Sequence, residues 1–91
     1  MKKYIFTAML FMGLGTNLNA DITTAAGATI ACYERGEAKG CFILGLKYFE
    51  YGETNDRQKN WRNAKELFGE ACDGGYTDGC EYYRRLDKLG F

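Results

Sequence analysis

Two stretches of the chain nearly repeat one another: ACYERGEAKGC at residues 31–41 and ACDGGYTDGC at residues 71–80. Each begins with Ala-Cys and ends with Gly-Cys, so the four cysteines of the sequence fall at the ends of these two stretches. A short polar segment that contains glycine and joins two apolar stretches is typical of the turn between two helices. The two stretches therefore predict two helical hairpins, each with a pair of cysteines beside its turn.

Glycines that follow apolar, periodic stretches indicate where the helices end, because a left-handed residue commonly closes a helix. These glycines are Gly36, Gly52, Gly74 and Gly90. We expect four helices, and the absence of proline agrees with this. Their expected ranges are 22–34, 39–51, 57–73 and 78–89. The predicted fold class is therefore all-α.

The hairpin features recur at a nearly constant distance. Equivalent glycines lie 38 residues apart, and equivalent cysteines lie 39 or 40 residues apart. A helical pair of this length is typical of a solenoid repeat. We therefore expect an α/α helical-hairpin repeat.

Side-chain patterns predict how the helices pack. Apolar residues surround nearly the whole of the segment 39–51, so we expect this helix to be central and covered on two sides. Small residues predict close helix contacts at Gly45, Ala64 and Ala71. Two acidic residues are expected to cap helix starts: Asp56 the third helix, and Asp78, with Glu81 three residues later, the fourth.

The first twenty residues have the organisation of a cleaved export signal. Lys2 and Lys3 are followed by an apolar run at 4–15 and a polar end that closes on Ala20. The run is too short for a membrane-spanning helix. We therefore predict a signal peptide at residues 1–20, a repeat domain at 21–91, and a periplasmic or secreted location.

The charge of the exported part excludes some classes of partner. Removing Lys2 and Lys3 leaves ten basic against twelve acidic side chains. Because no basic patch is present, we expect neither nucleic-acid binding nor insertion into a membrane after cleavage.

The cysteines are expected to form disulfides, since an even number of cysteines in a short exported chain is typical of a covalent framework. Three pairings are possible, and the sequence alone does not choose among them. Bridges within each hairpin, Cys32 to Cys41 and Cys72 to Cys80, have a geometric argument, because residues eight or nine apart can flank a turn with Cα atoms within about 6 Å. A zinc site normally needs closely spaced ligand pairs, and this chain has no histidine, so we expect no metal and no cofactor.

Several of these residues fall in one order along the chain: Gly40-Cys41, Leu44-Gly45, Tyr48, Gly52, Asn63-Ala64, Leu67-Phe68, Ala71-Cys72, Gly74-Gly75 and Gly79-Cys80. This order resembles the Sel-one-like repeat in its cysteine-rich, exported form, as in the Hcp cysteine-rich proteins, a family named as β-lactamases. The resemblance implies a tetratricopeptide-like fold, with bridges across each turn, and suggests β-lactam hydrolysis. The chain departs from the pattern after Gly52 and at Tyr83-Arg84, so only one repeat is complete, with degenerate caps.

The sequence therefore leaves two classes of function to consider, catalysis and binding. For catalysis, the sequence contains neither serine nor histidine, and the candidates that remain are Glu66 and Glu70, four residues apart on the third helix.

For binding, the chain has more aromatic residues than a small domain easily buries, and aromatic residues are favoured at interfaces. The candidate contact residues are Tyr48, Tyr51, Tyr82 and Tyr83, in a groove lined by the second and fourth helices. We expect an interaction scaffold for a protein, a peptide, a cell-wall component or a second copy of the chain. The alternative is β-lactam binding or weak hydrolysis, as the resemblance implies.

Overall fold

The computed structural model describes residues 22–91, and within this range the regular structure is entirely helical. The elements are α1 (Ala25–Thr29), the π-helix η3 (Ile30–Glu34), α2 (Ala38–Gly52), α3 (Arg57–Asp73) and α4 (Thr77–Lys88). Because α1 runs directly into η3, the four predicted helical segments are all present, with ends within three residues of their expected positions. The all-α fold class is confirmed. The predicted signal at residues 1–20 lies outside the described residues.

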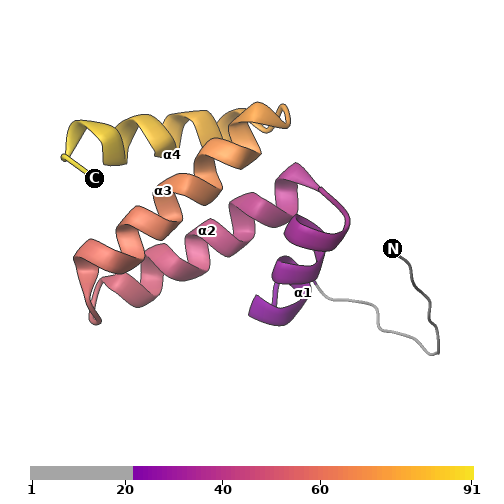
Figure 1. The fold of residues 1–91 in the computed structure, drawn as a ribbon, viewed down its shortest axis with the longest axis horizontal. Coiled ribbons are helices and arrows are strands. Elements are labelled where there is room, and N and C mark those ends of the chain that lie inside the picture. Colours follow the sequence, from indigo (N-terminus) through magenta and orange to yellow (C-terminus); the bar gives the residue numbers. More distant parts are fainter. Residues whose placement is uncertain (1–21) are drawn as a thin grey trace, which may run out of the picture.

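The second helical segment is central, as its apolar pattern predicted. In Figure 1, α2 lies between the α1–η3 segment on one side and α3 on the other, and α4 packs back along α3. α2 and α3 run antiparallel and are joined by the short turn at residues 53–56. The molecule is therefore a series of helical hairpins in which each helix packs on the next.

Aromatic rings fill the core between α2, α3 and α4. Phe68, in the middle of α3, has no exposed surface. The ring of Phe42 lies 5.0–5.6 Å, between centroids, from the rings of Phe68, Tyr76 and Tyr82. Gly45 lets the two central helices approach closely, because a Cβ atom there would lie 2.7 Å from the ring of Phe68. The predicted close contact at Gly45 is confirmed.

Each disulfide lies within one hairpin, which confirms the pairing that the geometric argument favoured. Cys32 is bonded to Cys41 and Cys72 to Cys80, with Cα–Cα distances of 4.5 Å and 4.6 Å. The two bridged turns lie at the same end of the molecule, since a Cβ atom on Gly74 would lie 2.8 Å from the Cβ of Ala38. The other end, at the turn between α2 and α3, has no covalent link among the described residues.

The π-helix explains why the two cysteine pairs differ in spacing. The cysteines are separated by 9 residues in the first hairpin and by 8 in the second. In the first turn the N–H of Glu37 donates to the carbonyl of Ala31, six residues back, whereas in the second the N–H of Tyr76 donates to Ala71, five residues back. Glu37 and Tyr76 are both the N-cap residues of the next helix. The additional residue is therefore absorbed by the wider turn of η3.

The recurring glycine before the second cysteine has a packing role. A Cβ atom on Gly40 would lie 2.5 Å from the Cβ of Ala31, and one on Gly79 would lie 2.9 Å from the Cβ of Ala71. Real Cβ atoms do not approach so closely, so each hairpin needs glycine facing alanine where its helices meet. This contact accounts for the near-repeat of Ala-Cys and Gly-Cys in the sequence.

The helices end at or beside all four predicted glycines, but only two of these glycines have the expected left-handed conformation. Gly36 and Gly90 have φ values of +66° and +94° and close their helices as expected. At the end of α3 the left-handed residue is Gly75, with φ +97°, whereas Gly74 has φ −84°. Gly52 is the last residue of α2 and allows close contact with the indole of Trp61. Close packing, not a left-handed turn, therefore accounts for Gly52 and Gly74.

The predicted caps are also only partly correct. Asp56 is the N-cap of α3, and its carboxylate accepts from the N–H of Lys59 at 3.3 Å. Asp78 is not a cap, because α4 begins one residue earlier, at Thr77, with Tyr76 as its N-cap. Glu81 instead forms an ion pair of 3.0 Å with Arg85, one turn later.

Candidate functional site

A groove runs along α2, with the α1–η3 segment as one wall and α3 as the other. It consists of two adjoining hollows that share the side chain of Tyr48. The first, of about 350 Å³, is called the apolar hollow and is lined by Ala25, Thr29, Leu44, Lys47, Tyr48, Tyr51 and Asn60. The second, of about 140 Å³, is called the acidic hollow and is lined by Tyr33, Tyr48, Asn63, Glu66, Leu67 and Glu70.

Helical periodicity places these residues in three stripes. Residues three or four apart lie on the same face of a helix. On the first wall Ala25, Thr29 and Tyr33 are each four residues apart, and α2 contributes residues from Leu44 to Tyr51 at the same kind of spacing. The stripe on α3 runs through Asn60, Asn63, Leu67 and Glu70. The groove is thus one continuous surface formed by three helical segments.

The apolar hollow has a buried floor and an open end. Leu44 on the floor is 5% exposed, whereas Tyr51 at the end is 60% exposed. Asn60 is buried, and its Nδ2 atom donates to the carbonyls of Asn55 and Asp56 at 2.9 Å and 3.1 Å. These two bonds hold the start of α3 and so shape the hollow. The Nδ2 donor is therefore already engaged within the protein. Lys47 contributes the basic side chain that borders this hollow.

The acidic hollow brings together Glu66 and Glu70, the two carboxylates named as catalytic candidates. They lie one helical turn apart on α3 and share the hollow with the phenols of Tyr33 and Tyr48. Partial burial of its phenol raises the pKa of Tyr33 above its usual value, and Glu70, Tyr48 and Glu66 raise it further. The contributions of Glu70 and Glu66 to this pKa shift reflect the negative charge of the hollow.

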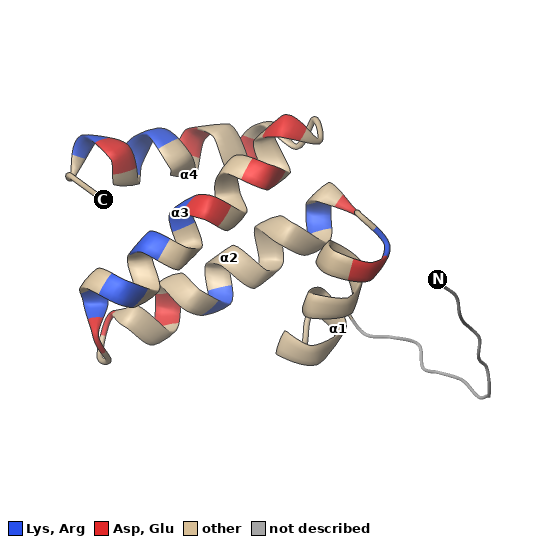
Figure 2. Ribbon diagram, in the orientation of Figure 1, with Lys and Arg blue, Asp and Glu red and all other residues tan. Residues whose placement is uncertain are grey.

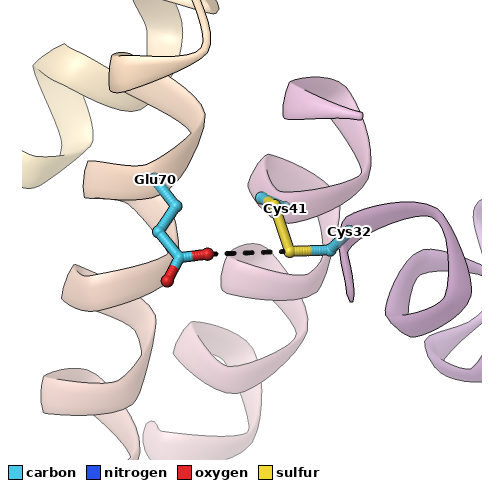
Figure 3. Close-up of side chains that lie close together, drawn as sticks. All are labelled: Cys32, Cys41 and Glu70. Carbon is cyan, nitrogen blue, oxygen red and sulfur yellow. Dashed lines mark hydrogen bonds between the residues drawn. A yellow bond between two sulfur atoms is a disulfide. The ribbon is translucent and has the colours of Figure 1, made fainter. Parts of the chain in front are cut away.

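Glu70 also contacts the first disulfide. In Figure 3 the carboxylate of Glu70 points from α3 toward Cys32, with 4.0 Å between Oε1 and Sγ. A disulfide sulfur carries no proton, so it cannot donate a hydrogen bond, and this is a van der Waals contact. The two Sγ atoms of Cys32 and Cys41 and a carboxylate oxygen of Glu70 lie within 4.8 Å of one another. Because thiolates bind metals and both sulfurs are bonded to each other, we assign no metal site here.

The charges on α3 are segregated along its length. Its first half carries Arg57, Lys59, Arg62 and Lys65, and its second half carries Glu66, Glu70 and Asp73. Figure 2 shows this change of sign along the helix. The acidic half lies toward the end of the molecule that the disulfides link. The negative potential of the acidic hollow is therefore continuous with an acidic end of the molecule.

The four tyrosines expected to contact a partner do not form one surface. Tyr48 and Tyr51 line the groove, but Tyr82 and Tyr83 lie on α4. Tyr82 packs inward, with its ring 5.0 Å from that of Phe68. Tyr83 is 39% exposed, and its ring lies 5.0 Å from the Nζ of Lys65.

The expected groove between the second and fourth helices is a separate hollow of about 220 Å³. Its lining residues are Phe49, Trp61, Tyr82, Arg85, Leu86 and Leu89. The guanidinium of Arg85 lies 5.1 Å from the ring centroid of Tyr82. This hollow does not include Tyr48 or Tyr51. The groove along α2 therefore contains one pair of the expected tyrosines together with both candidate carboxylates.

Tyr33 is the one tyrosine lining the groove hollows that the sequence did not single out. It is 63% exposed and lies next to Cys32, whose bridge holds η3 against α2. Its spacing of four residues from Thr29 was the available signal. That signal is weak, because the stripe becomes recognisable only when the opposite wall is known.

None of the helices in residues 22–91 is both long enough and apolar enough to cross a membrane. Comparisons of the chain with protein-family models, with curated proteins and with solved structures give no match. The resemblance to the Sel-one-like repeat therefore stays a prediction from the sequence.

Proposed function

We propose that the protein is an exported helical scaffold of the Sel-one-like repeat type that binds a protein, peptide or cell-wall partner in the groove along α2. The observation that supports this most is the exposure of aromatic side chains at the groove. Tyr33 is 63% exposed and Tyr51 is 60% exposed, and Tyr48 lies between the two hollows. Exposed aromatic residues beside a concave surface favour a binding role.

The covalent framework supports both the export and the rigidity of the scaffold. Two disulfides are compatible with an oxidising compartment. The first bridge fixes η3, which carries Tyr33, against α2, which carries Tyr48. A groove with fixed walls loses less conformational entropy when a ligand binds. We propose a periplasmic or secreted location on these grounds.

β-Lactam binding or weak hydrolysis is the second candidate, and one observation favours it. Glu66 and Glu70 open into the same hollow as two phenols, so groups that can transfer protons do meet. A penicillin, however, carries a carboxylate, which two glutamates would repel. The chain also has no serine or histidine to form a nucleophile–base pair. We therefore favour the scaffold.

Site-specific photo-crosslinking in the producing cell tests the proposal. A photoreactive phenylalanine analogue would replace Tyr33 or Tyr51 in the groove, or Leu89 as a control. Leu89 is 64% exposed and lines neither hollow of the groove, because it borders the separate hollow between α2 and α4. We expect a defined adduct from both groove positions and none from Leu89. Equal adducts at all three positions, or none at the groove, would contradict the proposal.

The enzymatic alternative is tested separately. Turnover of a chromogenic β-lactam by the oxidised protein, lost in Glu66→Gln or Glu70→Gln, would favour hydrolysis over the scaffold. A matched control is Glu50→Gln, because Glu50 is an exposed carboxylate of α2 that lines neither hollow. We expect no turnover by any of these proteins.

A further inference from the structure

The two ends of the groove have different chemistry. The apolar hollow offers the side chains of Ala25, Leu44 and Tyr51, whereas the acidic hollow offers two carboxylates. Tyr48 belongs to both hollows, so the two hollows adjoin and one ligand can reach both. A ligand that matches the groove therefore has an apolar group and a cationic group side by side.

The carboxylates of the acidic hollow are available to such a cation. The ion pairs of the described residues join Arg35 to Glu37, Lys65 to Asp87 and Arg85 to Glu81, and none includes Glu66 or Glu70. Lys65, the neighbour of Glu66 in the sequence, is turned to α4, where its Nζ lies 2.8 Å from Asp87 and 2.8 Å from the carbonyl of Phe91. No lysine or arginine lines the hollow. Its negative charge is thus left for a ligand.

The phenols add a second interaction that favours a cation. Tyr33 and Tyr48 border the same hollow as the carboxylates. A cation over an aromatic ring is attracted to its face, and a guanidinium also matches carboxylates with paired hydrogen bonds. Burial is the largest cause of the raised pKa of Tyr33, but Glu70 and Glu66 raise this pKa further, and the charge of these carboxylates also attracts a cation.

Lys47 gives the groove a direction. It borders the apolar hollow, so its positive charge opposes a cation at that end. The carboxylates attract the same cation at the other end. A peptide would therefore bind in one orientation, with its basic residue at Glu66 and Glu70.

We propose that the groove recognises a basic peptide segment, in which an arginine side chain enters the acidic hollow and an adjacent apolar side chain enters the apolar hollow. The inference rests on the proposed function and names the chemistry of its partner. It is supported by the charge complementarity between the unpaired carboxylates and the ligand.

Fluorescence anisotropy with two matched peptides tests the inference. The probe is a short fluorescein-labelled peptide with a single leucine followed by a single arginine. The comparison peptide carries citrulline, which has the shape of arginine without its charge. With the oxidised protein, expressed from its full sequence, we expect the arginine peptide to bind about fivefold more tightly at low salt, as an exposed ion pair of about 1 kcal/mol would give. High salt should reduce this advantage.

Paired variants assign the advantage to the hollow. Glu66→Gln/Glu70→Gln should bind both peptides equally, while circular dichroism shows the fold unchanged. The control Glu50→Gln/Glu53→Gln removes the same charge from exposed positions that line neither hollow, and it should keep the preference. Equal binding of the two peptides by the unmodified protein, or a preference retained in Glu66→Gln/Glu70→Gln, overturns the inference.

The remaining outcomes separate the inference from the proposed function. If both peptides bind equally and Tyr48→Ala abolishes binding, the groove binds peptides without selecting charge, and only the inference fails. If neither peptide binds and the groove positions give no photo-adduct, both fail. A dimer in sedimentation equilibrium that is lost in Glu66→Gln/Glu70→Gln would make a second copy of the chain the occupant, which also overturns the inference.

Discussion

Replacing Gly45 by alanine should destabilise the protein, whereas the same change at Gly69 should not. Both glycines lie inside helices, where alanine is favoured over glycine by about 1 kcal/mol. At Gly45 the new Cβ would lie 2.7 Å and 2.8 Å from two ring carbons of Phe68. Phe68 has no exposed surface, so its ring has nowhere to move. Overpacking of this kind costs about 1–3 kcal/mol.

The expected net effect at Gly45 is a loss of up to about 2 kcal/mol, since the overpacking cost is reduced by the gain of about 1 kcal/mol in helix propensity. At Gly69 the nearest atoms belong to Tyr83, at 3.1 Å and 3.2 Å. Because Tyr83 is 39% exposed, its ring can shift outward. Gly69→Ala should therefore gain about 0.5 kcal/mol. For a domain of this size, 1 kcal/mol corresponds to about 4–8 °C in Tm.

Urea unfolding of the oxidised variants, followed by far-ultraviolet circular dichroism, measures both changes. The midpoint should fall for Gly45→Ala and rise slightly for Gly69→Ala, with the slope unchanged in each case. A Gly45→Ala variant as stable as the unmodified protein would show that the core around Phe68 yields, and would refute the argument. A Gly69→Ala variant as unstable as Gly45→Ala would refute the assumption that the ring of Tyr83 can shift outward.

Three further predictions concern single interactions. Cys72→Ala/Cys80→Ala should lower the free energy of unfolding by about 2.5 kcal/mol, the loop-closure term for a loop of this length, and calorimetry that finds no loss of Tm would contradict this. Glu70→Gln should lower the pKa of Tyr33 toward its usual value, because a negative charge that disfavours the phenolate is removed; tyrosinate absorbance measures this, and an unchanged or higher pKa would count against it. Asn60→Ala should cost about 1–2 kcal/mol in chemical denaturation, because two carbonyls in the turn before α3 lose a buried donor.

Features that depend on local geometry could be predicted from the sequence. The helices and the disulfide pairing depend on contacts within a few residues of each turn, and both were predicted. The central position of α2 followed from its apolar pattern. The predicted conformation was wrong where it depended on a contact with a residue far away in the sequence. Gly74 packs on Ala38, so the left-handed residue at the end of α3 is Gly75.

The groove could be predicted only in part. Tyr48 and Tyr51 were expected to contact a partner, and Glu66 and Glu70 were expected to lie on one face of α3. The sequence did not indicate that α1–η3 would form the opposite wall and bring Tyr33 to the acidic hollow. That arrangement depends on η3. Its wider turn holds one more residue than an α-helical turn, and this changes the directions in which the side chains of η3 point. A pattern read with a single helical period does not include such a change.

Both disulfides lie at the same end of the molecule. Local unfolding should therefore be more frequent at the opposite end. The turn at residues 53–56 is held by noncovalent contacts, such as the bond from the indole Nε1 of Trp61 to the carbonyl of Phe49 at 3.0 Å. Amide protons near this turn should exchange with solvent sooner than those beside the bridges, and proteases should cut there first. Local unfolding at this end would loosen the groove around Tyr51. The walls around Tyr33 would stay in place, because the disulfide between Cys32 and Cys41 links them.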